Sequence, residues 1–248
     1  EEPEFFPNEK HAVDLLNSLH DRGDSPAVIG DHDRSLRNLR TYIEEYASED
    51  RITGVVGGDH SVSIPAFEAC LERHPDLHLV YIDTHLDARP DICGVRNTHA
   101  SAFLRAVEKL DGGKAMHLGF KNVGSSLYED YKHLASQQVK IITASDLRYP
   151  STSNATIREF VDGKNLYISL DLDALNPSEA PGVGTPSPGG LGYDHLVEIL
   201  TSIIHASNLV GFDIVELCPV YDQSERTSIL AATLIATIAS LVSIKETG

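Results

Sequence analysis

Short apolar runs rich in β-branched residues recur along the chain and predict the strands of a sheet. Each run is apolar without alternation, which is typical of strands whose two faces are both buried. The runs are Ile52–Val56, Leu77–Ile82, Met116–Phe120, Val139–Thr143, Leu166–Leu170 and Leu209–Val215.

Between these runs, apolar residues recur at the spacing of a helix face. Strands that alternate with helices predict βα units, and therefore an α/β domain with a mostly parallel sheet covered on both faces. No internal repeat or composition shift marks a boundary, so we expect a single domain over residues 1–248. The predicted helices are Ile64–Arg73, Ala100–Leu110, Ser126–Ser136, Tyr193–Ser207 and Arg226–Ile244.

Charge and composition narrow the function classes. Lys and Arg number 20 against 37 Asp and Glu, which gives a net charge of −17 that would repel nucleic acid and attract cations. Solubility or adaptation to salt would explain the same charge. No apolar run reaches the roughly 20 residues of a membrane span. No secretory signal is visible, and three scattered cysteines predict a reducing compartment, the cytoplasm.

Acidic residues and histidines follow three of the predicted strands. His60 ends the sequence GGDH, DTHLD contains Asp83, His85 and Asp87, and DLD contains Asp171 and Asp173. In open α/β sheets, ligands bind beyond the carboxyl ends of the strands. Since residues i, i+2 and i+4 of an extended chain point to one side, we expect these side chains to converge at one rim.

Four carboxylates and two imidazoles gathered at one rim predict a metal site. Without a cation the carboxylates would repel one another and some would have to bind protons. Two divalent ions remove that cost, and mixed oxygen and imidazole ligands suit Mn²⁺, with Zn²⁺, Fe²⁺ and Co²⁺ also possible. A solvated acidic rim is the alternative. The Pro- and Gly-rich stretch Asn176–Gly192 follows the last acidic strand end, which predicts an active-site loop rather than low complexity.

Four segments together resemble the ureohydrolase family, which includes arginase, agmatinase and formimidoylglutamase. They are GGDHSVS, YIDTHLD, SLDLDALNPSEAPGVGTPSPGGL and GFDIVELCPVYD. The resemblance implies a three-layer α/β/α sandwich around a mostly parallel sheet, a small-molecule substrate and a homotrimer or homohexamer. It also implies that His60 and Asp87 bind one Mn²⁺, that His85 and Asp173 bind a second, and that Asp83 and Asp171 bridge the two.

The implied reaction is hydrolysis by a hydroxide that bridges the two ions, because paired cations lower the pKa of a shared water. Attack on the central carbon of a guanidino or formimino group would release urea or formamide and an amine. Asp173 would accept a proton from the hydroxide. His99, in NTHASAF, matches a shuttle histidine of the family, although a solvent-facing histidine is the alternative. Glu216 matches the carboxylate that pairs with the cationic group of the substrate, and Thr185 would position substrate or simply form a turn.

The sequence also departs from the family pattern. Thr84 and Ala100 replace a common alanine and glycine, and the first strand and pocket loop of the family are not recognisable in residues 1–51. We therefore expect an N-terminal portion that is incomplete or divergent.

The sequence points to two classes of substrate, which differ in whether the tail beyond the reacting group is acidic or cationic. Arg89 resembles formimidoylglutamases and would bind an acidic substrate, although a surface pair with Asp91 is equally expected. His99, the stretch Pro219–Thr233 and the negative charge favour agmatine instead. We predict agmatinase-type activity first, formimidoylglutamate second, then arginine and guanidino acids. A catalytically silent, metal-binding subunit is the alternative from another class.

Overall fold

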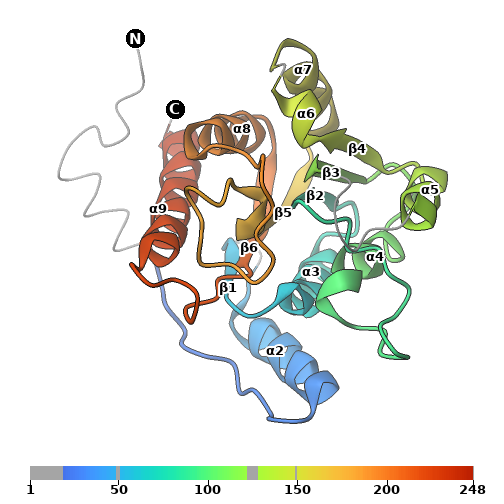
Figure 1. Cartoon of the computed structure of the whole chain (residues 1–248), viewed down its shortest axis with the longest axis vertical. Helices are drawn as coiled ribbons and strands as arrows, with labels where there is room; N and C mark the ends of the chain where they lie inside the picture. Colours follow the sequence, from blue (N-terminus) through green and yellow to red (C-terminus); the bar gives the residue numbers. More distant parts are fainter. Residues whose placement is uncertain (1–18, 49–50, 122–127, 149, 248) are drawn as a thin grey trace.

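The computed structural model describes residues 19–48, 51–121, 128–148 and 150–247. Its six strands form one sheet in the order β1-β6-β5-β2-β3-β4, and every neighbouring pair is parallel. The prediction of a parallel α/β sheet is therefore confirmed (Figure 1). The strands are β1 (Thr53–Val56), β2 (His78–Ile82), β3 (Ala115–Phe120), β4 (Lys140–Thr143), β5 (Asn165–Asp171) and β6 (Asn208–Val215).

Helices cover both faces of the sheet and complete a three-layer sandwich. One face packs against α7 (Pro150–Val161), α8 (Tyr193–Ala206) and α9 (Arg226–Thr247). The other packs against α2 (His32–Tyr46), α3 (Ser63–Arg73), α4 (Ala102–Val107) and α5 (Tyr128–Ser136). Each strand of the middle of the sheet sends alternate residues into the two cores, as Val80 and Leu79 illustrate. This arrangement is the fold that the sequence predicts.

Some elements differ from the sequence prediction. Helix α2 was not predicted, because among its fifteen residues only Leu36 and Ile43 are buried. Helix α7 and the short α6 (Ala144–Leu147) were also missed. The first two residues of the predicted helix Ser126–Ser136 lie outside the described residues.

The expectation that every strand is buried on both faces is wrong for the two edge strands. In β1, Gly54 and Val56 are exposed, and Lys140 is exposed in β4. The four central strands between them are buried almost throughout, which matches their apolar sequences.

Helix α9 corrects the expectation that no segment is long and apolar enough to span a membrane. Arg226–Lys245 has a mean hydropathy of 2.0 and reaches the required length, with 39% of its most apolar window buried. Its inner face, however, places Leu234, Ile238 and Leu241 in the core beside the sheet. We therefore interpret α9 as a core helix, with apolar side chains such as Ile229 on its outer face.

Candidate metal centre

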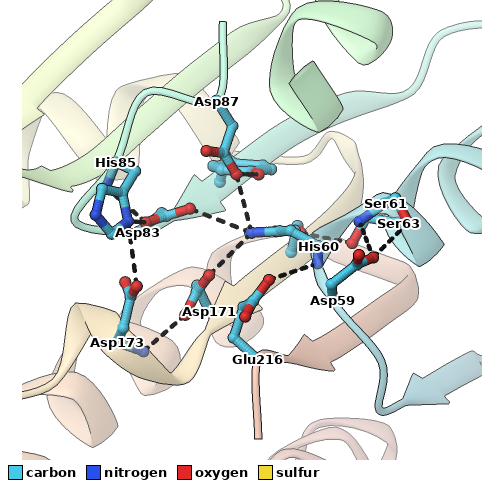
Figure 2. Close-up of polar contacts among 12 residues, drawn as sticks. Asp59, His60, Ser61, Ser63, Asp83, His85, Asp87, Asp171, Asp173 and Glu216 are labelled. Atoms are coloured by element: carbon cyan, nitrogen blue, oxygen red, sulfur yellow. Dashed lines mark hydrogen bonds and ion pairs between the residues drawn. The ribbon is translucent and has the colours of Figure 1, made fainter. Parts of the chain in front are cut away.

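The predicted ligands come from three strand ends that meet at one rim of the sheet (Figure 2). His60 begins the short 3₁₀ helix η1 (His60–Val62), which follows β1. Asp83 comes directly after β2, and Asp171 is the last residue of β5. Asp173 lies in the 3₁₀ helix η3 (Leu172–Ala174) that follows β5. Because the sheet is parallel and β5 lies beside β2, these ends bring the side chains together.

The imidazole of His60 faces three carboxylates. Its Nδ1 lies 3.0 Å from Asp171 Oδ2 and 3.2 Å from Asp83 Oδ2. The same nitrogen lies 3.2 Å from Asp87 Oδ2. His60, Asp83 and Asp171 are buried and the Asp87 side chain is 9% exposed; Figure 2 shows the three carboxylates pointing toward this nitrogen. This is the first cluster of potential ligand atoms.

His85 forms a second cluster on the other side of Asp83. Its Nδ1 lies 3.1 Å from Asp173 Oδ2 and 3.4 Å from Asp83 Oδ1. Potential ligand atoms of His60, Asp83 and Asp171 lie within 4.8 Å of one another, and so do those of Asp83, His85 and Asp173. Asp83 belongs to both groups. One of its oxygens faces His60 and the other faces His85, which is the arrangement of a carboxylate that bridges two ions.

The side chains converge by a different route from the one that the sequence suggested. Strand β2 ends at Ile82, so strand alternation does not place His85 and Asp87. Instead, the chain turns after Asp83 and reaches Asp87, which has a left-handed backbone with φ 43°. Asp173 likewise lies in a helical turn rather than in β5. The turn lets Asp87 face the first cluster while His85 faces the second.

Burial and mutual repulsion perturb the pKa values of this cluster. Burial, with the charges of Asp87 and Asp173, raises the pKa of Asp83 to about 7. Burial and neighbouring carboxylates also hold the pKa of Asp171 well above its usual value. Burial opposes a charge on His85, but contacts with Asp173 and Asp83 outweigh it and raise its pKa to about 11. Negative charge is thus in excess, and a cation would relieve it.

The residues present fit a pair of divalent cations. Asp83 Oδ2 and Asp173 Oδ1 are buried, and neither accepts a hydrogen bond from any residue that the structure describes. A buried carboxylate oxygen without a donor is costly unless a cation binds it. Carboxylate and imidazole ligands without thiolate suit Mn²⁺ better than structural zinc.

A buried hydrogen-bond chain orients the ring of His60. Its Nε2 lies 2.9 Å from Ser169 Oγ, which donates to Asp213 Oδ1 at 2.7 Å. Since the Ser169 proton goes to Asp213, the Ser169 oxygen accepts from Nε2–H of His60. Nε2 therefore carries a proton, and Nδ1 is the ring nitrogen that would bind a cation in the first cluster. Such contacts behind a ligand fix the tautomer and orientation of metal-binding histidines.

These supporting residues form a row across the sheet that we call the polar row: His117, Tyr81, Ser169 and Asp213. They are register partners on β3, β2, β5 and β6. Tyr81 donates from its hydroxyl to Asp87 Oδ2 at 2.7 Å. Burial lowers the pKa of His117 to about 4, so the neutral ring donates from Nε2 to the His85 carbonyl at 2.6 Å. The sequence prediction missed the polar row, because its members become neighbours only once the strand order is known.

Glu216 and His99 lie at the edge of the cluster. Glu216 follows β6 with a left-handed backbone, φ 65°, and its Oε1 accepts from the backbone N–H of His60 at 2.8 Å. Burial raises the pKa of Glu216, and the nearby charge of His99 acts in the opposite direction. His99 is exposed at the start of η2 (His99–Ser101). An exposed imidazole within electrostatic reach of a half-buried carboxyl is placed to exchange protons with solvent.

Thr185 and Arg89, the other two residues predicted to bind substrate, both contact side chains of the protein. Thr185 lies in the loop Asn176–Gly192 and donates from Oγ1 to Asp173 Oδ2 at 2.8 Å. Arg89 pairs with Asp130 rather than with Asp91, with Nε 3.6 Å from Asp130 Oδ2. The loop thus reaches a candidate metal ligand, whereas Arg89 shares its charge with a neighbouring helix.

Lys121 is a cation at the rim that the sequence analysis overlooked. It comes directly after β3, and its Nζ donates to the carbonyl of Ser187 in the loop Asn176–Gly192 at 2.7 Å. Burial lowers its pKa, while the charges of Asp173 and Asp83 act in the opposite direction. The signal in the sequence is the charged residue that follows the apolar run MHLGF. Its position puts a positive charge beside the carboxylates.

The fold and the site together define an α/β protein with a carboxylate–imidazole metal centre at the carboxyl rim of a parallel sheet. The Arginase family model matches residues 7–240. The chain is 28% identical over 228 residues to an agmatinase of Halalkalibacterium halodurans, covering 92% of this chain and 76% of that protein. It is 33% identical over 210 residues to a guanidinobutyrase of Pseudomonas aeruginosa, covering 81% and 64%. The chain therefore belongs to the arginase family.

A solved structure agrees with this assignment. The formimidoylglutamase of Bacillus subtilis superposes with a TM-score of 0.81 at 26% identity, over 92% of this chain and 72% of that one. The prediction of a metal-dependent hydrolase of the ureohydrolase class in an arginase-like fold is thus confirmed. The chain spans between 64% and 76% of the length of these three relatives.

Proposed function

We propose that this protein is a binuclear manganese hydrolase that cleaves a linear C–N bond of a guanidino substrate. The observation that carries the proposal is the position of Asp83, whose two oxygens face separate ligand clusters 3.2 Å from His60 and 3.4 Å from His85. A site for a single ion would not require the two oxygens of Asp83 to face two different imidazoles. The number of ions is therefore the first quantity to measure.

Each ion would have two ligands of its own and share two carboxylates with the other ion. His60 and Asp87 would hold one Mn²⁺, His85 and Asp173 the other, and Asp83 and Asp171 would contact both. When bound, the ions would supply Lewis acidity and a water of lowered pKa. The polar row would keep His60 in the required tautomer and hold Asp87 by the Tyr81 hydroxyl.

Glu216 and His99 would act on the substrate. The carboxylate of Glu216 is half-buried and already directed by the His60 N–H, so it would pair with a guanidinium cation at a fixed position. His99 is exposed and would donate a proton to the leaving amine, a task that imidazole side chains commonly perform in enzymes. Thr185 would hold Asp173 in place from the overlying loop.

Agmatine is the substrate that we propose first. Its guanidinium and its amine both carry positive charge, and the protein carries a net charge of −17 that would attract such a molecule. The 28% identity to an agmatinase over 92% of this chain supports the same choice.

The test is a substrate panel with metal analysis. The protein is loaded with Mn²⁺, the bound metal is counted by mass spectrometry, and agmatine, guanidinobutyrate, arginine and formimidoylglutamate are supplied separately. We expect two ions per chain and release of urea from agmatine. Release of formamide from formimidoylglutamate alone would overturn the guanidino assignment, and a single ion per chain would overturn the binuclear centre. Retention of two ions without hydrolysis of any compound would favour the silent subunit.

An acidic substrate tail is the second candidate, and Lys121 is the observation that favours it. Its Nζ lies at the rim, tied to the overlying loop by Ser187. A fixed cation there would attract the carboxylate of guanidinobutyrate or formimidoylglutamate and repel the amine of agmatine. The 33% identity to a guanidinobutyrase supports this alternative.

Replacement of Lys121 separates the two tails. In Lys121→Gln we expect KM for guanidinobutyrate to rise roughly three- to tenfold, as the loss of one partly exposed charge contact would produce, while KM for agmatine falls or stays unchanged. Lys132→Gln, which removes an exposed lysine of α5, is the matched control. Equal KM changes for both substrates would show that Lys121 does not contact the tail.

The assembly remains a prediction as well. We propose a homotrimer or homohexamer, as the family resemblance implies, and sedimentation equilibrium of the metal-loaded protein measures it.

A further inference from the structure

A recess lies between α2, α3 and α4. It has a volume of about 500 Å³, which lies within the usual size of a small-molecule site. Residues of all three helices and of the loop before His99 line it. None of the residues predicted to act on metal or substrate lines it, so the recess is distinct from the candidate metal centre.

The recess gathers positive charge in a strongly negative protein. Five basic and three acidic side chains line it, although acids outnumber bases 37 to 20 in the chain as a whole. The basic residues are Arg37, Arg40, Arg96, Arg105 and Lys109. A local excess of cations within a negative field attracts small anions to the recess.

Arg105 is the central feature of the recess. Its side chain is only 6% exposed, and its Nη2 donates to the Pro90 carbonyl at 3.2 Å. Its Nε and Nη1 are buried and make no hydrogen bond to any residue that the structure describes, although Nη1 lies 3.0 Å from Glu108 Oε2. Burial lowers its pKa. A buried guanidinium with unused donors is costly unless an acceptor satisfies them.

The surrounding pairs leave positive charge uncompensated. Glu108 contacts both Arg96, at 3.4 Å, and Arg105, so one carboxylate serves two guanidinium groups. Arg37 is exposed on the α2 side and forms no ion pair with a described residue. Arg40, by contrast, is saturated by Glu44, Glu68 and Glu72. The guanidinium groups whose charge is not fully compensated are therefore those of Arg37, Arg96 and Arg105.

We propose that this recess binds a small oxyanion, either a carboxylate or a phosphate group of a metabolite, through Arg105 with Arg37 and Arg96. Guanidinium groups are the preferred partners of both oxyanions. The bound anion would touch the segments next to His99, the candidate proton donor, and His60, a candidate metal ligand. Asn97 lines the recess two residues before His99, and Ile64 lines it at the start of α3, directly after η1.

Calorimetric titration of the metal-loaded protein tests the proposal without any assay of hydrolysis. Sulfate, inorganic phosphate and succinate are titrated separately at constant ionic strength, so that the tetrahedral and carboxylate sources are distinguished. We expect saturable binding of at least one anion with one site per chain. Linear, non-saturating heats for all three would overturn the proposal.

Four variants locate the site. Arg105→Met, which keeps the apolar stem, and Arg37→Gln should each weaken binding, the first by at least about tenfold. Arg34→Gln is the matched control for Arg37→Gln. Arg34 is an exposed arginine of α2, as Arg37 is, but it does not line the recess. Glu108→Gln removes the competing carboxylate and should strengthen binding. A merely structural role for Glu108 would weaken it, and unchanged binding in Arg37→Gln, even if Arg105→Met fails to fold, would place the anion elsewhere.

Discussion

Replacing Asp83 by asparagine is expected to abolish hydrolysis and, at the same time, to stabilise the protein from which metal has been removed. The loss of activity follows because the amide cannot replace a charged oxygen shared by both ligand clusters. Metal ions supply several kcal/mol of transition-state stabilisation, so we expect kcat/KM to fall by at least about a thousandfold. The steady-state rate of urea release measures it.

The gain in stability follows from the pKa of Asp83. Burial and two neighbouring carboxylates raise that pKa to about 7. Ionising this group therefore costs free energy in the folded, metal-free protein. Asparagine has nearly the same shape and no charge to ionise. The midpoint of thermal unfolding, measured after treatment with EDTA at neutral pH, should therefore rise in Asp83→Asn. Asp162→Asn, an exposed change, should alter neither quantity. If Asp83→Asn instead lowered the midpoint and left activity intact, Asp83 would be an ordinary structural carboxylate.

The second large effect is a reversal of the pH dependence of stability when Mn²⁺ is added. Asp83 has a folded pKa of about 7 against a usual 3.8, so between these values the folded state binds more protons than the unfolded state. His85, with a folded pKa of about 11 against 6.5, behaves in the same way at higher pH. Since stability falls with pH wherever the folded state binds more protons, both groups make the metal-free protein less stable as pH rises.

Metal changes the sign because the ions bind deprotonated ligands and release protons. With excess Mn²⁺, the midpoint of thermal unfolding should therefore rise with increasing pH. In EDTA, it should fall with increasing pH over the same range. Differential scanning calorimetry across that range measures both curves. In Asp83→Asn the metal-free decrease between pH 4 and pH 7 should become shallower. Parallel curves with and without Mn²⁺ would contradict the assignment of this cluster as a metal centre.

The sequence predicted the sheet and the convergence of the candidate ligands because both depend on local patterns. Fully buried parallel strands are continuous apolar runs, and all six runs became strands. In a parallel sheet the carboxyl ends lie on one side, so side chains just after β2 and β5 had to meet. The expectation that an extended strand would align the residues after Asp83 was wrong. A turn with a left-handed residue places Asp87 instead.

What the sequence did not predict depends on contacts between distant segments. Ser169 and Asp213 support His60 only because β5 and β6 pair in a register that sets them side by side. Arg89 was assigned to a substrate or to Asp91, but the partner that it meets, Asp130, belongs to a helix about forty positions further on. Helix α2 carries too few apolar residues to stand out from its polar surroundings, and its packing against α3 decides its place.

The left-handed backbone at Asp87 and Glu216 has a consequence for engineering. The left-handed conformation costs roughly 1–2 kcal/mol for a residue with a side chain, a penalty that glycine escapes and that asparagine and aspartate partly escape. Directed evolution for heat resistance alone would therefore favour glycine at both positions, most strongly at Glu216. The resulting proteins would survive heating yet lack two acids of the reaction centre, so only a library sorted for turnover as well as thermal tolerance would retain them.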